Sequence, residues 1–131
     1  RSNLSAVDAV QYPNSADVHL DKPHLSFYRD GNLLYEVGSD KAVYNIQNKK
    51  VVFEQNVVLN KTADAKRLAG IVKTERLNVD TEAQYAHTDS PVTFQYGQSG
   101  GQANGMTYDH KTGLLNFPSK VKATIYDTKN L

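Results

Sequence analysis

Histidines with acidic neighbours are the side chains in this chain best suited to chemistry. His87 lies two residues before Asp89, and His110 directly follows Asp109. An imidazole beside a carboxylate can serve as a general acid or base, or as half of a metal site. A base also needs a nucleophile to activate, and zinc needs three or four ligands, but no further residues are spaced to supply them. These four residues therefore give only a weak hypothesis, that of a hydrolase or a carbohydrate-binding module.

Two segments have a composition that could suggest a site but is better explained by turns. Residues 109–113 read Asp-His-Lys-Thr-Gly, which is typical of a hairpin turn. Residues 97–105 contain four glycines, but they lack the Gly-Lys-Ser/Thr ending of a phosphate-binding loop. We interpret this second segment as a flexible turn or a place where backbones approach closely.

Composition excludes several classes of function. The chain has 131 residues, which suits one domain, and its 15 Lys and Arg against 14 Asp and Glu give no field that would attract nucleic acid. There is no cysteine, hence neither a disulfide framework nor a thiolate metal site. No apolar run approaches the roughly 18 residues that span a bilayer. We expect no metal and no cofactor.

Alternating hydrophobicity is the main structural signal, and it predicts antiparallel strands with one dry face each. Apolar residues recur at every second position in three runs: Leu77 and Val79; Val92, Phe94 and Tyr96; Val121, Ala123 and Ile125. Asp30-Gly31 lies between two further alternating runs and predicts a hairpin, because glycine tolerates the positive φ that such turns demand. Residues 61–68 could form two helical turns but are more consistent with an excursion between strands, followed by a strand over about 71–79.

Three units of the sequence resemble one another loosely. Residues 42–59, 77–94 and 106–123 each contain an alternating run, a polar turn, a second run and a short break before a valine, at Val57, Val92 and Val121 respectively. This pattern predicts stacked strand pairs, in which each unit needs a neighbour to cover its dry face.

The aromatic residues allow two interpretations. Eight tyrosines and four phenylalanines occur, and an aromatic row inside a sheet is usually core. A small antiparallel domain without a covering helix can also hold a groove between its sheets that suits an acyl chain. The pattern alone favours core over groove.

The order and spacing of several segments resemble the periplasmic domain of the LptC family of lipopolysaccharide-export proteins, in the wider group that includes LptA. The segments are Tyr28-Arg-Asp-Gly-Asn-Leu-Leu-Tyr-Glu-Val37, Ala42-Val-Tyr44, Leu77-Asn-Val-Asp-Thr81, Ala86-His-Thr-Asp-Ser-Pro-Val92, Tyr96-Gly97, Gly105-Met106 and Ser119-Lys-Val-Lys-Ala-Thr-Ile125. The similarity covers residues 20–126, and residues 61–70 do not match clearly.

The resemblance implies an all-β, open, twisted antiparallel β-jellyroll whose apolar interior shields the acyl chains of lipopolysaccharide. It implies a non-enzymatic bridge component that receives lipopolysaccharide from the inner-membrane ATP-binding-cassette transporter and passes it to LptA. The N-terminal edge would meet the transporter's LptF and LptG components, and the C-terminal edge would continue into LptA. The location would be the periplasmic side of the inner membrane, with a single N-terminal anchoring helix in the full-length protein.

Domain bounds follow from the polar start of the chain. Residues 1–20 are expected to be a polar tail or linker after a removed membrane anchor, becoming an edge strand only near its end. Residues 21–131 are expected to form the single β-jellyroll domain.

Site residues follow from the resemblance together with the predicted dry rows. The expected lipid-binding residues are Phe53, Leu115, Ile125, Phe94, Tyr35 and Tyr44. Gly31 and Gly97 correspond to glycines that matter for function or assembly. The expected partner edges contain Leu25 and Phe27 on one side and Val121, Ala123 and Tyr126 on the other. A purely structural bridge, with an ordinary packed core and functional edges only, is the alternative hypothesis.

Overall fold

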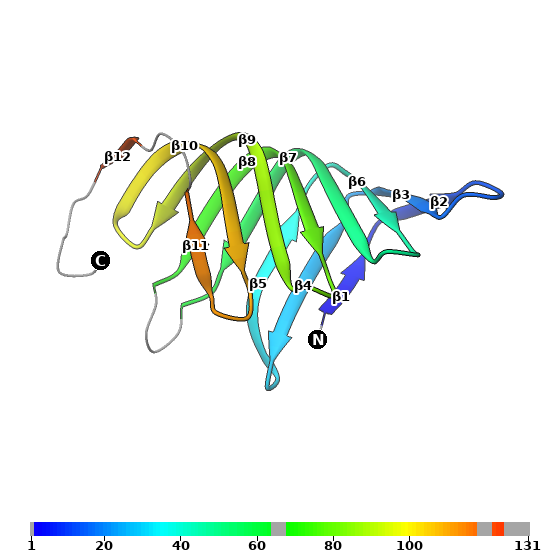
Figure 1. Ribbon diagram of the computed structural model, residues 1–131, viewed down its shortest axis with the longest axis horizontal. Coiled ribbons are helices and arrows are strands. Elements are labelled where there is room, and N and C mark those ends of the chain that lie inside the picture. The colour runs from blue at the N-terminus through cyan, green and yellow to red at the C-terminus, as the bar shows by residue number, and fades with distance from the viewer. Residues whose placement is uncertain (1, 64–67, 118–121, 125–131) are drawn as a thin grey trace.

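The protein is an all-β sheet structure, described here from a computed structural model for residues 2–63, 68–117 and 122–124 (Figure 1). The described residues form a 12-stranded antiparallel sheet. The strands are β1 (Ser2–Ser5), β2 (Asp8–Gln11), β3 (Asp17–Asp21), β4 (His24–Arg29), β5 (Asn32–Gly38), β6 (Lys41–Asn45), β7 (Lys50–Lys61), β8 (Gly70–Asp80), β9 (Tyr85–Tyr96), β10 (Ser99–Asp109), β11 (Leu114–Asn116) and β12 (Lys122–Thr124).

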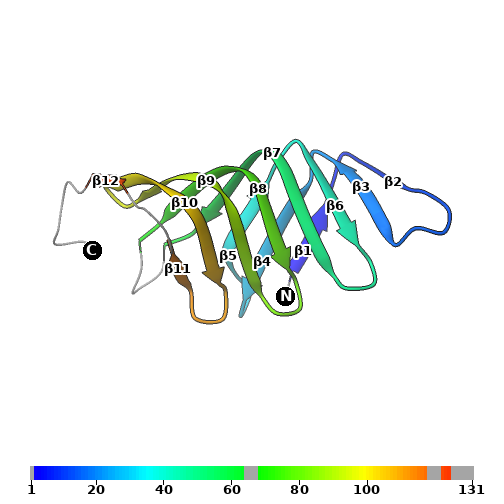
Figure 2. The same ribbon diagram turned by 45° about the horizontal axis from the view of Figure 1, so that its top comes forward.

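The sheet is folded over itself into two half-sheets. The long strands β7 to β10 run through both of them. The start of β7 pairs with β6 at Lys50 to Glu54, whereas its end pairs with β5 at Val58 to Lys61. The first half-sheet contains β1, β4, β5 and β12, and the second contains β2, β3, β6 and β11, with β7 to β10 crossing between them. In both ribbon views the long strands arch over one side and their turns hang from the other, so the half-sheets form a V (Figures 1 and 2).

A row of backbone irregularities marks the bend of the V, which we call the bend row. In β7 it is Gln55 and Asn56, with φ of 67 and 55°, and in β10 it is Gly105, with φ of 115°. The pairings β7–β8, β8–β9 and β9–β10 all shift register at this height. An extra residue in one strand kinks it and increases its twist, so aligned bulges fold the whole sheet along one line.

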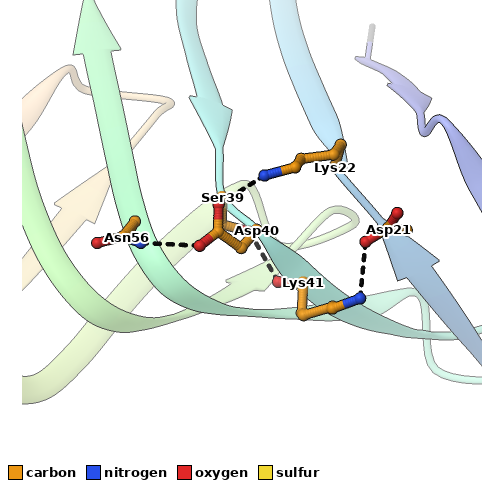
Figure 3. Close-up of polar contacts among 6 residues, drawn as sticks. All are labelled: Asp21, Lys22, Ser39, Asp40, Lys41 and Asn56. Atoms are coloured by element: carbon orange, nitrogen blue, oxygen red, sulfur yellow. Dashed lines mark hydrogen bonds and ion pairs between the residues drawn. The ribbon is translucent and has the colours of Figure 1, made fainter.

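Hydrogen bonds and ion pairs join successive chain crossings along the bend row. The backbone N–H of Lys22 donates to the Asp40 carbonyl at 2.9 Å, and that of Asp40 donates to the Gln55 carbonyl at 2.9 Å. Figure 3 shows the Asp40 carboxylate between two side-chain donors, Lys22 at 3.0 Å and Asn56 at 2.7 Å. The Asn56 hydrogen bond, then the one from Lys22, lowers the pKa of Asp40. The neighbouring Lys41–Asp21 ion pair, at 2.7 Å, continues this polar rim.

The interior lies between the half-sheets and is filled from both. The first half-sheet contributes buried Leu25, Tyr35, Val37, Val57, Leu59, Val72 and Val92, and the second contributes buried Ala42, Val51, Phe53, Leu77, Val79, Ala86, Met106 and Tyr108. In β8 the inward positions change from even to odd numbers across the bend, from Thr74 to Leu77. In β10 they change in the opposite sense, from odd to even numbers, between Ala103 and Met106. The bend therefore keeps both halves of a strand facing one interior.

Most of the predicted elements are confirmed. Asp30 and Gly31, with φ of 53 and 81°, form the two-residue turn between β4 and β5. β8 covers the strand expected over 71–79. The short breaks before Val57 and Val92 are the points where β7 and β9 cross the bend row. The similarity of those two sequence units therefore reflects the same bend in two strands. The third break, before Val121, lies outside the described residues.

Residues 1–20 differ from the expected polar tail, because most of them are strand. β1 pairs with β4, and β2 forms a hairpin with β3, which in turn pairs with β6. Short strands that lie at a sheet edge carry few apolar residues, so alternation is a weak signal here.

The first half of β10 also differs from the sequence-based interpretation, which assigns residues 97–105 to a flexible turn or a place where backbones approach closely. Gly100 and Gly101 lower its strand propensity, yet β9 pairs with it on one side and β12 on the other. Val121, Ile125 and Tyr126 lie outside the described residues, which include only Lys122 to Thr124 of the run expected there.

Gly105→Ala is expected to destabilise the protein by about 1 to 3 kcal/mol, because a side chain is strained at positive φ. A Cβ at this position would also lie 3.1 Å from the Thr88 carbonyl oxygen, which is backbone and cannot easily move. Urea unfolding gives the measurement. The control is Gly38→Ala, whose Cβ would meet only ordinary contact at 3.7 Å. Equal stability of the two variants would show that the β10 kink does not need a glycine.

Candidate functional site

The candidate site is the apolar interior of the V, which continues from the packed middle to both ends of the sheet. In the middle, Tyr35, Phe53 and Met106 are each 0% exposed. Partly buried apolar side chains extend the same interior, namely Leu4, Ala6, Val18 and Tyr44 towards the N-terminal end, and Phe94, Leu115 and Phe117 towards the other. The interior is therefore sealed in the middle and less tightly packed at its ends.

The N-terminal end of the V contains a cavity of about 420 Å³. Its walls come from β1 and β4 of the first half-sheet and from β2, β3 and β6 of the second. They include Leu4, Ala6, Leu20, Leu25 and Tyr44. Because these side chains are apolar and lie at the end of the core, this cavity is a suitable place for part of a hydrocarbon chain.

The other end of the interior is closed by two stacked rings. Phe94 of β9 lies 4.1 Å from Phe117, measured between ring centroids, with the planes 21° apart. Phe117 follows β11, so this stack joins the two half-sheets across the interior.

The two free sides of the V meet on the side opposite the bend row, which we call the open edge. The Arg29 guanidinium, at the end of β4, donates to the backbone carbonyls of His110 and Lys111 at 3.0 and 3.1 Å. Beneath it, the Phe27 ring stacks on Tyr35 with centroids 4.5 Å apart, and His110 contacts Phe27 edge-on at 4.7 Å. These contacts connect residues about eighty positions apart in the sequence.

The aromatic cluster at the open edge contains two polar atoms without hydrogen-bond partners in the described part of the chain. They are the buried Oη of Tyr35 and the buried Nδ1 of His110. Burial, together with the neighbouring Arg29 charge, lowers the pKa of His110 to about 4, and burial raises the pKa of Tyr35. Both side chains are therefore neutral near pH 7. Unsatisfied buried atoms make the closed arrangement costly.

Gly97 holds the β9–β10 turn against the segment that precedes β8. Its N–H donates to the Ala69 carbonyl at 3.0 Å, and the Leu68 N–H donates to the Tyr96 hydroxyl at 3.3 Å. The buried Lys61 ammonium donates to the Leu68 carbonyl at 3.3 Å. A Cβ at Gly97 would lie 2.5 Å from Leu68 Cδ1, so the Leu68 side chain would have to shift to admit it. Gly31 differs, since nothing lies within 4 Å of a Cβ there.

The predicted lipid-binding residues lie along the interior but in different surroundings. Phe53 and Tyr35 are in the sealed middle, and Tyr44 lines the N-terminal cavity. Phe94 and Leu115 are partly buried near the opposite end. Ile125 lies outside the described residues. Their lipid contact remains a prediction, and Phe53 and Tyr35 could meet a lipid only if the half-sheets separate.

The edge predicted at Leu25 and Phe27 needs a correction. Both side chains are only 1% exposed, and β4 pairs with β1 as well as β5, so neither residue lies at a free edge. The short strand β1, which the sequence did not indicate, takes that place. At the other end Ala123 lies in β12, whose partner among the described strands is β10. Val121 and Tyr126 lie outside the described residues.

The histidine–carboxylate residues do not converge on one site. His87 is exposed on the outer face of β9 and Asp89 is exposed at the bend row, whereas His110 is buried inside the V. The turn predicted at residues 109–113 is present, closed by the Gly113 N–H on the Asp109 carbonyl at 2.7 Å. Within residues 2–63, 68–117 and 122–124, no group of three or more His, Cys, Asp or Glu could hold a metal ion. The same ranges contain no helix long and apolar enough to cross a membrane.

The sequence did not single out Arg29 or Phe117, and it indicated His110 as a turn residue or a weak catalytic candidate, not as part of the interior. Phe117 is aromatic and follows the short run Leu114-Leu115, which could have marked it as core. For Arg29 no local signal exists, because its partners are backbone carbonyls of a distant turn.

One family model matches the chain, and a solved structure shares its fold. The family model described as "Lipopolysaccharide-assembly, LptC-related" matches residues 1–127. Among solved structures, the chain is similar to LptH of Pseudomonas aeruginosa, described as the LptA-homologous periplasmic component of the conserved lipopolysaccharide transport device. That match has a TM-score of 0.72 at 6% identity and covers 97% of this chain and 96% of LptH, so it shows the fold. No curated protein matches the sequence.

Gly97→Ala is expected to destabilise the protein more than Gly31→Ala. Positive φ strains both variants by roughly 1 to 2 kcal/mol, but only at position 97 must a neighbour also move. Urea unfolding in a Leu68→Ala background isolates that second term, since the contact is then absent. An unchanged difference in that background would show that Leu68 is not what excludes a side chain at Gly97.

His110 is expected to make stability fall as the pH is lowered. Its pKa is about 4 in the folded chain against 6.5 for an ordinary histidine, so below pH 6.5 the unfolded chain binds a proton that the folded chain does not. The loss grows from pH 6.5 downward and is on the order of 2 to 3 kcal/mol near pH 4.

Unfolding free energies of wild type and His110→Phe between pH 7 and 4 provide the measurement. The variant is expected to show a shallower decline. His87→Phe, which changes an exposed histidine on the outer face, is the control. Parallel curves for wild type and His110→Phe would contradict the buried neutral imidazole.

Proposed function

The chain belongs to the LptC-related family of lipopolysaccharide-assembly proteins, and from this premise we propose that it binds the acyl chains of lipopolysaccharide between its half-sheets and passes the lipid along a bridge of similar domains. The observation that carries the proposal is the continuity of the apolar interior. It runs from the cavity at Leu4 and Tyr44 to the stack at Phe94 and Phe117. The apolar interior therefore extends along the long axis of the sheet, from one end to the other.

The edges of the sheet support assembly of such a bridge. β1 and β2 end the two half-sheets at the N-terminal side, and among the described strands β11 and β12 end them at the other. Near β2, Val7, Val10 and Tyr12 are exposed apolar side chains. An exposed strand edge can accept a strand from another chain. We propose that the N-terminal edge meets the inner-membrane transporter components LptF and LptG and that the β12 end continues into LptA.

Energetics favour partial rather than complete enclosure of the lipid. Burying one CH₂ contributes about 0.8 kcal/mol, so a fully dehydrated chain of about a dozen carbons would gain on the order of 10 kcal/mol. A lipid with several such chains would not leave a closed pocket. An interior that is less tightly packed at its ends would hold the chains less completely, and ATP hydrolysis by the transporter would drive them onward. We propose that the protein works on the periplasmic side of the inner membrane.

The alternative is a structural bridge without lipid, and the sealed middle favours it. Phe53 and Tyr35 are fully buried, as residues of an ordinary core would be. In that case the edges alone would carry the function. The two proposals differ in whether the ends of the interior contact lipid.

Photocrosslinking separates these proposals at positions where a probe can be accommodated. A photoreactive phenylalanine at Tyr44 or Phe94, at the two ends of the interior, is expected to label purified lipopolysaccharide. The same probe at Ile71, an exposed position on the outer face of β8, is the control and is expected to stay unlabelled. Labelling at none of the three, with the fold verified by circular dichroism, would support the structural bridge and overturn the lipid proposal.

A further inference from the structure

The open edge is closed at one place by contacts between two hairpin turns. The β4–β5 hairpin belongs to the first half-sheet and the β10–β11 hairpin to the second, and their tips lie side by side in both ribbon views (Figures 1 and 2). Arg29 makes the polar contacts between them, at 3.0 Å to the His110 carbonyl and 3.1 Å to the Lys111 carbonyl. We call this pair of contacts the clasp.

Cavities flank the clasp on both sides. One, of about 520 Å³, is lined by Tyr28 and Gln84 among others, and the second, of about 570 Å³, by Leu34 and Tyr108 among others. Both have Arg29, Asp30 and His110 in their walls. The clasp therefore divides what would otherwise be one opening into the side of the V.

Below the clasp lies the sealed middle of the interior. His110 contacts Phe27 at 4.7 Å and Tyr35 at 5.4 Å between ring centroids, and Tyr35 contacts Tyr108 at 4.9 Å. His110 is the residue that links the clasp to these rings, since its carbonyl accepts from Arg29 while its ring covers the cluster. If the turn moved away, its ring would leave with it and expose Phe27 and Tyr35.

Each of the two hairpin tips has one side that no other described strand covers. The register of β4 with β5 shifts between Phe27 and Tyr28, and only two residue pairs, Tyr28–Leu33 and Arg29–Asn32, lie beyond it before the turn. β11 has three residues, and among the described strands it pairs with β10 alone. Neither tip is held by a strand on both sides, whereas the bend row is.

Two buried polar atoms without hydrogen-bond partners among the described residues destabilise the closed arrangement of the clasp. His110 Nδ1 and Tyr35 Oη are buried without a hydrogen-bond partner in the described part of the chain. Opening would give both atoms access to water, while the charge-assisted bonds of Arg29 oppose it. The balance between these terms sets how often the edge opens.

We propose that the open edge at the clasp is the entry site for the acyl chains of an amphiphilic lipid, and that Arg29 is the residue that keeps this entry shut until lipid arrives. The inference rests on the proposed function. It adds a lateral route into the middle of the interior, between the hairpin tips, to the path between the two ends.

Hydrogen exchange tests the clasp without any lipid. The His110 N–H, which donates to the Gln84 carbonyl, and the Gly113 N–H report on the β10–β11 turn. In Arg29→Gln both are expected to exchange about tenfold faster, since two hydrogen bonds from a charged donor are lost. Arg76→Gln removes the same charge beside the bend row, at a 3.7 Å pair with Glu54, and is the matched control. Unchanged exchange in Arg29→Gln would overturn the clasp.

Tethering the tips tests the entry route. The chain has no cysteine, so Asp30→Cys and Lys111→Cys, at exposed positions, can be joined by a short cleavable dithiol-reactive reagent. Uptake of fluorescent lipopolysaccharide is expected to fall at least about tenfold in the joined protein and to recover after cleavage by reductant. The control joins Lys111→Cys to Leu114→Cys within one hairpin and is expected to bind lipid as wild type does.

The outcomes separate the two proposals. If wild type binds lipid and the joined protein binds it equally fast, lipid enters elsewhere and the entry proposal is overturned while the proposed function stands. If wild type binds no lipid at all, the proposed function fails, and with it the lipid entry. Faster uptake by Arg29→Gln than by Arg76→Gln, together with loss of uptake on joining, would establish the entry site.

Discussion

The bend shared by the long strands is the constraint on which the rest of the structure depends. β7, β8, β9 and β10 must all kink at the same height, or their neighbours could not stay paired on both sides of the bend. Gln55 and Asn56 in β7 and Gly105 in β10 meet this need with left-handed backbone conformations. The result is one sheet with two inner faces, which provides an interior without a second sheet or a helix.

This geometry explains why the interior is tight in the middle and looser elsewhere. Close to the bend row and along the central strands, side chains from both half-sheets meet, and Phe53 and Val51 are fully buried. Towards the ends, a half-sheet runs out of partners, so Tyr44 on one side and Phe94 on the other are only partly covered. A packed middle stabilises the free protein, and incompletely covered ends suit a ligand that must pass through. Both properties agree with the proposed transport of lipid, in which the domain remains folded when no lipid is bound.

At the open edge, residue types that often serve in catalysis instead hold the two half-sheets together. His110 follows Asp109, and a histidine beside a carboxylate is a common catalytic pair. In this protein, however, its ring packs against Phe27 and Tyr35 and is kept neutral by burial. Arg29 uses its charge on backbone carbonyls rather than on an acidic partner. Together these contacts close the V at this edge, through two hydrogen bonds from a charged donor and the packing of one ring.

The sequence by itself determined the local features of this protein. Alternation identified the strands around Phe53, Leu77 and Phe94, and Asp30-Gly31 fixed a hairpin turn, because strand faces and tight turns follow from neighbouring residues. The order of motifs indicated the family and therefore the jellyroll.

Only the tertiary structure decided which strands end the sheet and which side chains meet across it. Residues 2–5 become β1, and glycine-rich Gly100 and Gly101 lie in β10, because pairing partners far away in the sequence supply the hydrogen bonds. The inward face changes from Thr74 to Leu77 in β8 because the strand kinks there, which strict alternation cannot reveal. Likewise, the contact of Arg29 with the β10–β11 turn joins residues about eighty positions apart, and it exists only once the sheet has folded over.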